Sequence, residues 1–263
     1  MPPQVSEWSN LVLRWFHVFA AILWVGQTYY FTKLARALAQ DEVPAWMAQN
    51  GEIYVAERRG TQKLLPPKLL SIRWEALATW ISGFLLLGLL YYSGGGLLLS
   101  DTAGIRMGAG VGIGIGLLLV GWTIYDLLWI SPLGRFPVLA GVICYLLLVA
   151  LAYWLVHVFS GRAVYIHIGS LLGTILTANL FMRILPAQRR LAAAAGQGQP
   201  LDAALLARVK SRSRHNLLLV VPVVFLMIST HFPVATYGRS DSWLILSILV
   251  LVGALAAKLL YRI

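Results

Sequence analysis

Seven apolar stretches, each long enough to cross a lipid bilayer, constrain what this chain can fold into. A helix needs about 20 apolar residues to span the hydrocarbon core of a bilayer. Lipid offers the backbone no hydrogen-bonding partner, so such stretches fold as helices. We therefore predict an all-α, polytopic membrane helix bundle with about seven transmembrane helices, forming a single integral membrane domain over residues 1–263. The predicted spans are residues 10–33, 74–94, 106–129, 136–159, 164–185, 215–233 and 242–260.

The composition excludes an ordinary soluble domain. Charged residues make up 12% of the chain and hydrophobic residues 59%, whereas soluble domains carry about 25% charged residues. The net charge of +11 is typical of nucleic-acid binding, but basic residues beside apolar spans more often set topology and contact anionic lipid. We expect the bilayer and no nucleic acid as partner. The single cysteine, Cys144, has no disulfide partner, and the absence of a C-x-x-C-H motif excludes covalently attached c-type haem.

The distribution of basic residues predicts the orientation. With the N-terminus outside, all but four of the 21 Lys and Arg residues fall on the inner side. The positive-inside rule therefore predicts an N-out, C-in protein.

Two local patterns predict how parts of the chain pack. Apolar residues between Leu201 and Val209 share one helical face, which predicts a short amphipathic helix on the inner leaflet, with a solvated linker as the alternative. Glycines occupy every second position from Gly108 to Gly116. No strand precedes them, so they indicate close helix packing rather than a dinucleotide loop.

Four of the five histidines fall at the same end of the predicted spans, and an ionisable group in lipid is costly enough to indicate a built site. Neutral imidazoles from two helices can hold a haem iron, whereas no Cys or carboxylate accompanies them to complete a tetrahedral zinc site. The simpler alternative is an interfacial histidine bonded to water or headgroups, which suits His157 best and His17 least. We predict haem b, with its iron held by two of His17, His167 and His231.

A second polar group gathers at the opposite, inner end of the spans. An acid, amides, cations and an imidazole at one surface can bind a planar polar anion and move its protons. The alternative is that Glu75 and Asp126 only pair with nearby arginines such as Arg183. The members are Trp74, Glu75, Asp126, Asn179, Arg214, His215 and Asn216.

Short motifs spread through most of the chain carry a family resemblance. They are Leu-Arg-Trp-Phe-His at 13–17, Trp-Val-Gly at 24–26, Arg-Trp-Glu-Ala at 73–76, Tyr-Asp-Leu-Leu at 125–128, Ser-Pro-Leu-Gly at 131–134, His-Ile-Gly at 167–169, Arg-Ser-Arg-His-Asn at 212–216 and Met-Ile-Ser at 227–229. In these motifs the chain resembles the membrane domain of the bacterial cytochrome-c-type urate hydroxylases. The first span also resembles that of membrane protoporphyrinogen oxidases, which implies a haem-b helix.

The resemblance implies an oxidoreductase of the bacterial inner membrane that oxidises urate, or a related purine, to 5-hydroxyisourate. It implies haem b on the histidines and a separate cytochrome c or quinone as electron partner, because the family's cytochrome c domain is not in this chain. On this interpretation the catalytic residues are Glu75, Asp126 and His215. The substrate-binding residues are Trp74, Asn179, Arg214 and Asn216.

Two other functions stay open. The family carries His-Gly-Gly-Gly-Phe-Tyr in the first inner connection, where this chain has Ala-Glu-Arg-Arg-Gly-Thr at 56–61. A non-catalytic haem-b protein for electron relay or assembly would lack that motif. A small-anion transporter would use the inner basic residues as a vestibule.

Overall fold

The computed structural model describes residues 3–40, 44–57, 73–93 and 96–261. Seven helical segments are long and apolar enough to cross a membrane, which confirms the predicted helix bundle. They are α1 (Pro3–Gln40), α2 (Arg73–Leu87) continued by the π-helical turn η1 (Gly88–Tyr92), α3 (Met107–Ile130), α4 (Pro137–Leu155), α5 (Gly161–Ala178) continued by the π-helical turn η3 (Asn179–Ile184) and α6 (Leu185–Gly196), α7 (Ala203–Ser229) and α8 (Ser242–Tyr261). The short 3-10 turns are η2 (Pro132–Arg135) and η4 (Pro233–Ala235).

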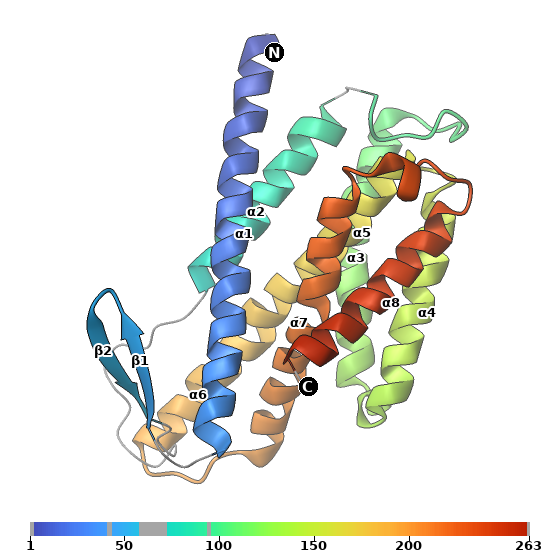
Figure 1. Cartoon of the computed structure of the whole chain (residues 1–263). Coiled ribbons are helices and arrows are strands. Elements are labelled where there is room, and N and C mark those ends of the chain that lie inside the picture. The colour runs from blue at the N-terminus through green and yellow to red at the C-terminus, as the bar shows by residue number, and fades with distance from the viewer. Residues whose placement is uncertain (1–2, 41–43, 58–72, 94–95, 262–263) are drawn as a thin grey trace.

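Helix α5 lies at the centre of the bundle and contacts α2, α3 and α7 (Figure 1). Most of its 18 residues are buried. The other helices leave large apolar side chains exposed, among them Trp15, Leu119 and Val138. Lipid solvates such surfaces, so this pattern agrees with a bundle that sits in a bilayer.

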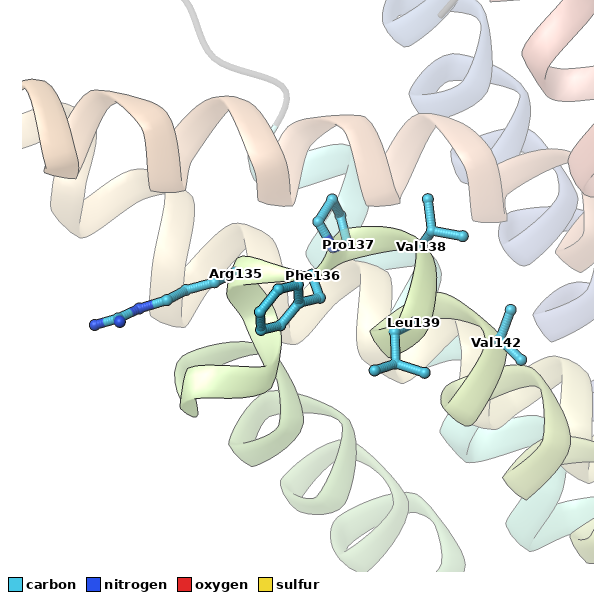
Figure 2. A pocket seen from close by; sticks show the side chains of 6 residues that line it. All are labelled: Arg135, Phe136, Pro137, Val138, Leu139 and Val142. Atoms are coloured by element: carbon cyan, nitrogen blue, oxygen red, sulfur yellow. The ribbon is translucent and has the colours of Figure 1, made fainter.

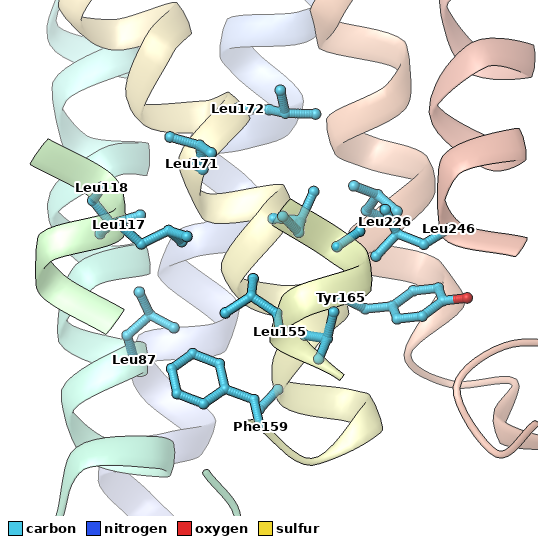
Figure 3. Close-up of a cluster of buried hydrophobic side chains, with 14 of the residues drawn as sticks. Leu87, Leu117, Leu118, Leu155, Phe159, Tyr165, Leu171, Leu172, Leu226 and Leu246 are labelled. Carbon is cyan, nitrogen blue, oxygen red and sulfur yellow. The ribbon is translucent and has the colours of Figure 1, made fainter. Parts of the chain in front are cut away.

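The helices are held together by close packing of aliphatic and aromatic side chains (Figure 3). Leu155, Phe159, Leu226 and Leu246 are almost fully buried between α4, α5, α7 and α8. Tyr165 adds a polar tie, because its hydroxyl donates to the backbone oxygen of Ser242 at 2.9 Å.

The start of α1 and the end of α8 lie at opposite ends of the bundle, as an odd number of spans requires (Figure 1). We name these the His167 end, near the start of α5, and the Asp126 end, near the end of α3. The N-out, C-in orientation, which would place the His167 end outside, stays a prediction.

The fifth span runs further than residue 185, the predicted end. The helix continues through η3 into α6 and ends at Gly196. Pro186 lacks the backbone N–H that would bond to Met182, and a widened π-helical turn precedes it. This turn places Asn179 and Arg183 inside the bundle end.

The predicted short amphipathic helix on the inner leaflet is wrong, because these residues form the first turns of α7. The Asp202 side chain caps that helix by accepting from the Leu205 backbone N–H at 3.0 Å, and no helix breaker follows before the span. Val209 is buried in a cluster with Leu191 of α6. The apolar face therefore packs against a neighbouring helix instead of lipid.

The first inner connection contains a β-hairpin that the sequence analysis does not predict. Strands β1 (Ala45–Gln49) and β2 (Glu52–Ala56) pair antiparallel. Asn50 and Gly51 join them with φ angles of 52° and 80°, the conformation for which Asn-Gly turns are favoured. Residues 56–61 replace the family motif in this connection, and residues 58–61 among them lie outside the described residues.

The glycine run of α3 packs closely at alternate glycines only. A Cβ at Gly114 would lie 2.6 Å from the Tyr92 hydroxyl, and one at Gly110 would lie 2.5 Å from Leu99. Gly112 and Gly116 face open space. The predicted close packing is thus confirmed for one face of the helix.

A glycine also sets the approach of α8 to α7. A Cβ at Gly253 would lie 2.9 Å from the Pro222 Cα, which is backbone and cannot rotate away. We predict that Gly253→Ala lowers the melting temperature of the purified protein, since overpacking costs about 1–3 kcal/mol. Gly112→Ala is the matched control, and its melting temperature should stay equal or rise. Equal melting temperatures for both variants would contradict the close approach.

Candidate functional site

A buried ion-pair group lies at the Asp126 end. The Asp126 carboxylate accepts hydrogen bonds from Arg183, through Nε at 2.9 Å and Nη2, and from Arg212 Nη2 at 2.7 Å. Asp126 and Arg212 are both buried. Two guanidinium groups and one carboxylate leave one net positive charge at this end of the bundle, where the Arg212 side chain is buried and the Arg183 side chain is 39% exposed.

Amide and ring groups extend this group into a network. The Asn179 amide donates to the Tyr125 hydroxyl at 3.0 Å and to Asn216 Oδ1 at 3.1 Å. Asn216 in turn donates to the backbone oxygen of Leu176 at 2.9 Å. Because Tyr125 accepts from Asn179, its own hydrogen is available for His215 Nδ1, 2.7 Å away. We call the set of Tyr125, Asp126, Asn179, Arg183, Arg212, His215 and Asn216 the polar cluster.

Helix geometry explains how the sequence builds the polar cluster. Arg212, His215 and Asn216 are three and four residues apart, so they share one face of α7. Arg214 lies on another face and is exposed. Arg214 is the arginine predicted from the sequence as a site residue, whereas Arg212 is the one that joins the polar cluster. The spacing of Arg212 from His215 and Asn216 is the sequence signal that identifies it.

Of the predicted inner group, Asp126, Asn179, His215 and Asn216 come together, whereas Trp74 and Glu75 lie at the start of α2. Trp74 is exposed, with the guanidinium of Arg73 5.1 Å from its ring centre. Glu75 Oε1 accepts from Gln27 Nε2 of α1 at 3.2 Å. Its Oε2 is buried and has no hydrogen-bond partner in the part of the chain that the structure describes.

Glu75 nevertheless lies at the level of the polar cluster. Helices α2 and α5 run in opposite directions, and the Trp80 indole donates to Thr174 Oγ1 at 3.1 Å across them. Five residues from each partner toward the Asp126 end lead to Glu75 and Asn179, which therefore share one depth in the bundle.

His17 is arranged as a ligand donor. Its Nδ1 lies 2.9 Å from the Thr79 backbone oxygen and 3.0 Å from Ser82 Oγ. A carbonyl can only accept, so Nδ1 carries the proton and Nε2 keeps its lone pair. Gly83 leaves room beside the ring, since a Cβ there would lie 3.0 Å from His17 Cε1.

His167 is held in the same manner but is fully buried. Its Nδ1 donates to the Ala163 backbone oxygen at 2.7 Å, and its Nε2 accepts from the Tyr92 hydroxyl at 3.0 Å. Tyr91 and Phe159 pack against the ring. To bind a metal, Nε2 would have to give up its bond to Tyr92.

The histidines do not converge on one point. His17 contacts Thr79 and Ser82, whereas His167 contacts Tyr91 and Tyr92 further along the same helical segment. His231 lies exposed just after α7, as does His157 after α4. Among the residues described, no three His, Cys, Asp or Glu side chains group closely enough to hold a metal ion.

Two arginines lie near the His167 end. The guanidinium groups of Arg14 and Arg162 both lie close enough to the Tyr91 phenol to act on it electrostatically. Arg162 Nε is buried without a hydrogen-bond partner in the described ranges. Arg14 also donates to Asn10 Oδ1 at 2.6 Å. Two cations within electrostatic range of Tyr91, which packs on His167, would suit a dianionic group.

Comparison with known proteins gives one match. The family model described as Urate oxidase N-terminal matches residues 3–262, so the chain belongs to this family over nearly its whole length. No cytochrome c domain was found. No curated protein and no solved structure matched the chain.

The ion pairing of Asp126 can be tested by removing its charge. We predict that Asp126→Asn strongly destabilises the purified protein, by roughly 3–5 kcal/mol, because two guanidinium groups would lose their buried counterion. Thermal unfolding in detergent measures the effect.

The matched control is Asp241→Asn in the exposed loop after η4. There Arg239 donates to Asp241 at 2.9 Å and holds the pKa of that carboxyl below its usual value. Exposed pairs contribute little, so this variant should unfold like the wild type. A loss of stability equal to that of Asp126→Asn would show that burial is not the cause.

Proposed function

We propose that this member of the urate oxidase N-terminal family is a membrane oxidoreductase that oxidises urate to 5-hydroxyisourate and passes the electrons to a separate cytochrome c. We place it in the bacterial inner membrane. The observation that carries the proposal is the polar cluster, a largely buried, net positive site at one end of the bundle whose Arg183 side chain reaches the surface.

The chemistry of the polar cluster suits a planar anion. Urate is a weak acid that carries one negative charge near neutral pH, which complements the one uncompensated positive charge. Arg212 offers a planar donor group to such a ligand. The amides of Asn179 and Asn216 can donate to and accept from a heterocycle.

The proposed reaction balances with water and a one-electron acceptor. Urate and water give 5-hydroxyisourate, two protons and two electrons. Two molecules of oxidised cytochrome c take the electrons. The protein must therefore bind urate, admit water and accept protons.

Glu75 is the best candidate for the proton acceptor. Its Oε2 is buried without a partner among the described residues. Both oxygens of Asp126 already accept from arginines, which suits a positioning role. His215 Nδ1 is already bonded to Tyr125, so His215 would act by relaying a proton.

The donors that would hold haem b lie toward the His167 end, and they would have to be brought together, because His17 and His167 do not face one common point in the structure. His17 Nε2 would be the first iron ligand, and His167 Nε2 the second once Tyr92 moves away. Arg14 and Arg162 would pair with the propionates of the porphyrin. Bound there, the haem would accept and release single electrons. The exposed His231 has no comparable anchor.

One feature favours a non-catalytic electron-relay protein as the second candidate. The polar groups of the cluster satisfy one another through hydrogen bonds, as in a site with only a structural role.

Membranes containing the protein should consume urate and reduce added cytochrome c under the first proposal. Haem without urate consumption under any electron acceptor would leave the relay function.

The iron ligands can be separated by their spectra. We predict that His17→Ala abolishes or shifts the Soret and α bands of the purified protein, because it removes an anchored Nε2 donor. His231→Ala and His157→Ala change equally sized groups at exposed positions and should leave the reduced-minus-oxidised spectrum intact. An unchanged spectrum in His17→Ala would rule this ligand out.

The role of Glu75 predicts a specific kinetic change. A general base contributes about 100-fold or more to the rate. Glu75→Gln should therefore lower kcat for urate by at least about that factor and change KM little. Glu7→Gln, at the exposed start of α1, is the control. A normal kcat in Glu75→Gln would move the base to another residue.

A further inference from the structure

A large apolar cavity lies beside the polar cluster, between α3, α4, α5, α7 and α8. Its volume is about 870 Å³, within the range of sites that hold small molecules. It runs along α3 from Trp129, near the Asp126 end, to Ile113. This stretch corresponds to roughly 24 Å of helix rise.

The lining of this cavity has an unequal distribution of polar groups. Among the residues that the structure describes, no charged side chain lines it, and most of the lining is aliphatic. Tyr125, Trp129 and His215 gather at the Asp126 end. A ligand matched to this shape is uncharged, with a small polar head and a long apolar tail.

The head end offers a hydrogen-bond donor that the protein uses only weakly. Trp129 Nε1 is buried, and within the described ranges its one partner is the Cys144 thiol, a weak acceptor that also lines the cavity. The Trp129 ring centre lies 3.9 Å from that of His215. The indole N–H can donate to a carbonyl oxygen of the ligand, beside two aromatic rings that would contact a flat head group.

The cavity has an apolar approach from the side of the bundle. A shallow groove at the start of α4 is lined by Pro137, Val138 and Val142, which also line the cavity (Figure 2). Figure 2 shows Arg135 pointing away from these side chains. Val138 is 80% exposed, so a lipid-soluble ligand would meet mainly apolar groups on this route, with Arg135 at its edge.

We propose that this cavity binds an isoprenoid quinone, with the quinone ring at Trp129 and His215 and the tail along α3 and α4. The quinone carbonyls accept hydrogen bonds, the ring is flat and uncharged, and the tail matches the aliphatic lining. Its use as an electron partner rests on the proposed function, whereas its binding does not. A phospholipid acyl chain is the other possible occupant of an apolar cavity. Its terminal methyl group has no acceptor for the Trp129 N–H at the head end of the cavity.

The test fills the cavity at a glycine. Gly116 lines it, and a Cβ there meets nothing within 4 Å. Gly116→Leu should therefore fold while its side chain occupies the tail space. Gly112→Leu, one turn earlier on α3, also faces open space but does not line the cavity. Quinone extracted from the purified proteins should be abundant in wild type and Gly112→Leu and at least about tenfold lower in Gly116→Leu.

A second pair of variants tests the head group. In quinone-free nanodiscs, decylubiquinone should bind Trp129→Phe roughly three- to tenfold more weakly than wild type, because one hydrogen bond is lost. Trp122→Phe is the control, since Trp122 has a buried, unpartnered indole N–H among the described residues but does not line the cavity. Gly141→Leu on α4 replaces Gly116→Leu if that variant fails to elute as a single species.

The outcomes separate this proposal from the proposed function. Phospholipid without quinone in wild type, or equal quinone in Gly116→Leu and Gly112→Leu, overturns the quinone site. Both assays omit urate and cytochrome c. Quinone binding in a protein that never consumes urate therefore supports the cavity and rejects the oxidase, and the converse result rejects the cavity alone.

Discussion

A buried charge in a bundle that faces lipid must be paired with an opposite charge. Here the Asp126 carboxylate is the shared ion-pair partner that joins three helical segments. It accepts from Arg183 of η3 and Arg212 of α7 while it belongs to α3. The pairing fixes the ends of these segments relative to one another. Tyr125, the residue before Asp126, is thereby held between Asn179 and His215. The arrangement leaves one positive charge over, which would favour an anion at this end of the bundle, as the proposed function requires.

Tyr125 and His215 form the wall between two different environments. On one side lies the polar cluster, with guanidinium and amide groups. On the other side lies a cavity with no charged lining residue among those described, and both rings line it. A charged, water-soluble substrate and a neutral, lipid-soluble one would thus be separated by a pair of hydrogen-bonded side chains. The hydrogen bond between the Tyr125 hydroxyl and His215 Nδ1 links the two rings of this wall.

The sequence predicts the features that depend on the length and apolarity of whole segments. It does not predict the features that depend on local backbone geometry and on which side chains meet. Seven spans follow from the length and apolarity of the stretches, and the structure has them within a few residues for α2, α3 and α8. The end of the α5 span differs from the prediction because Pro186 is preceded by a widened turn and does not end the helix. The start of α7 differs because the apolar face before Arg212 packs against α6. The hairpin was not predicted, although Asn50-Gly51 is a strong turn signal. The basic residues of this connection indicate topology but not its local structure. In the polar cluster, residue type alone selected Arg214, whereas spacing from His215 selects Arg212.

The histidines show how far residue type and depth can indicate a role. His17 and His167 both donate Nδ1–H to a backbone carbonyl, which fixes the tautomer that presents Nε2 to an iron. They differ at Nε2: within the described residues no hydrogen bond reaches Nε2 of His17, whereas Tyr92 donates to Nε2 of His167. Close packing maintains the contact between Tyr92 and His167. Both side chains lie directly against Gly114 of α3 and so cannot shift toward that helix. Haem binding through both rings would therefore require the η1 turn, which carries Tyr91 and Tyr92, to move. π-Helical turns are frequent at functional sites, and η1 is the segment whose movement would free Nε2 of His167.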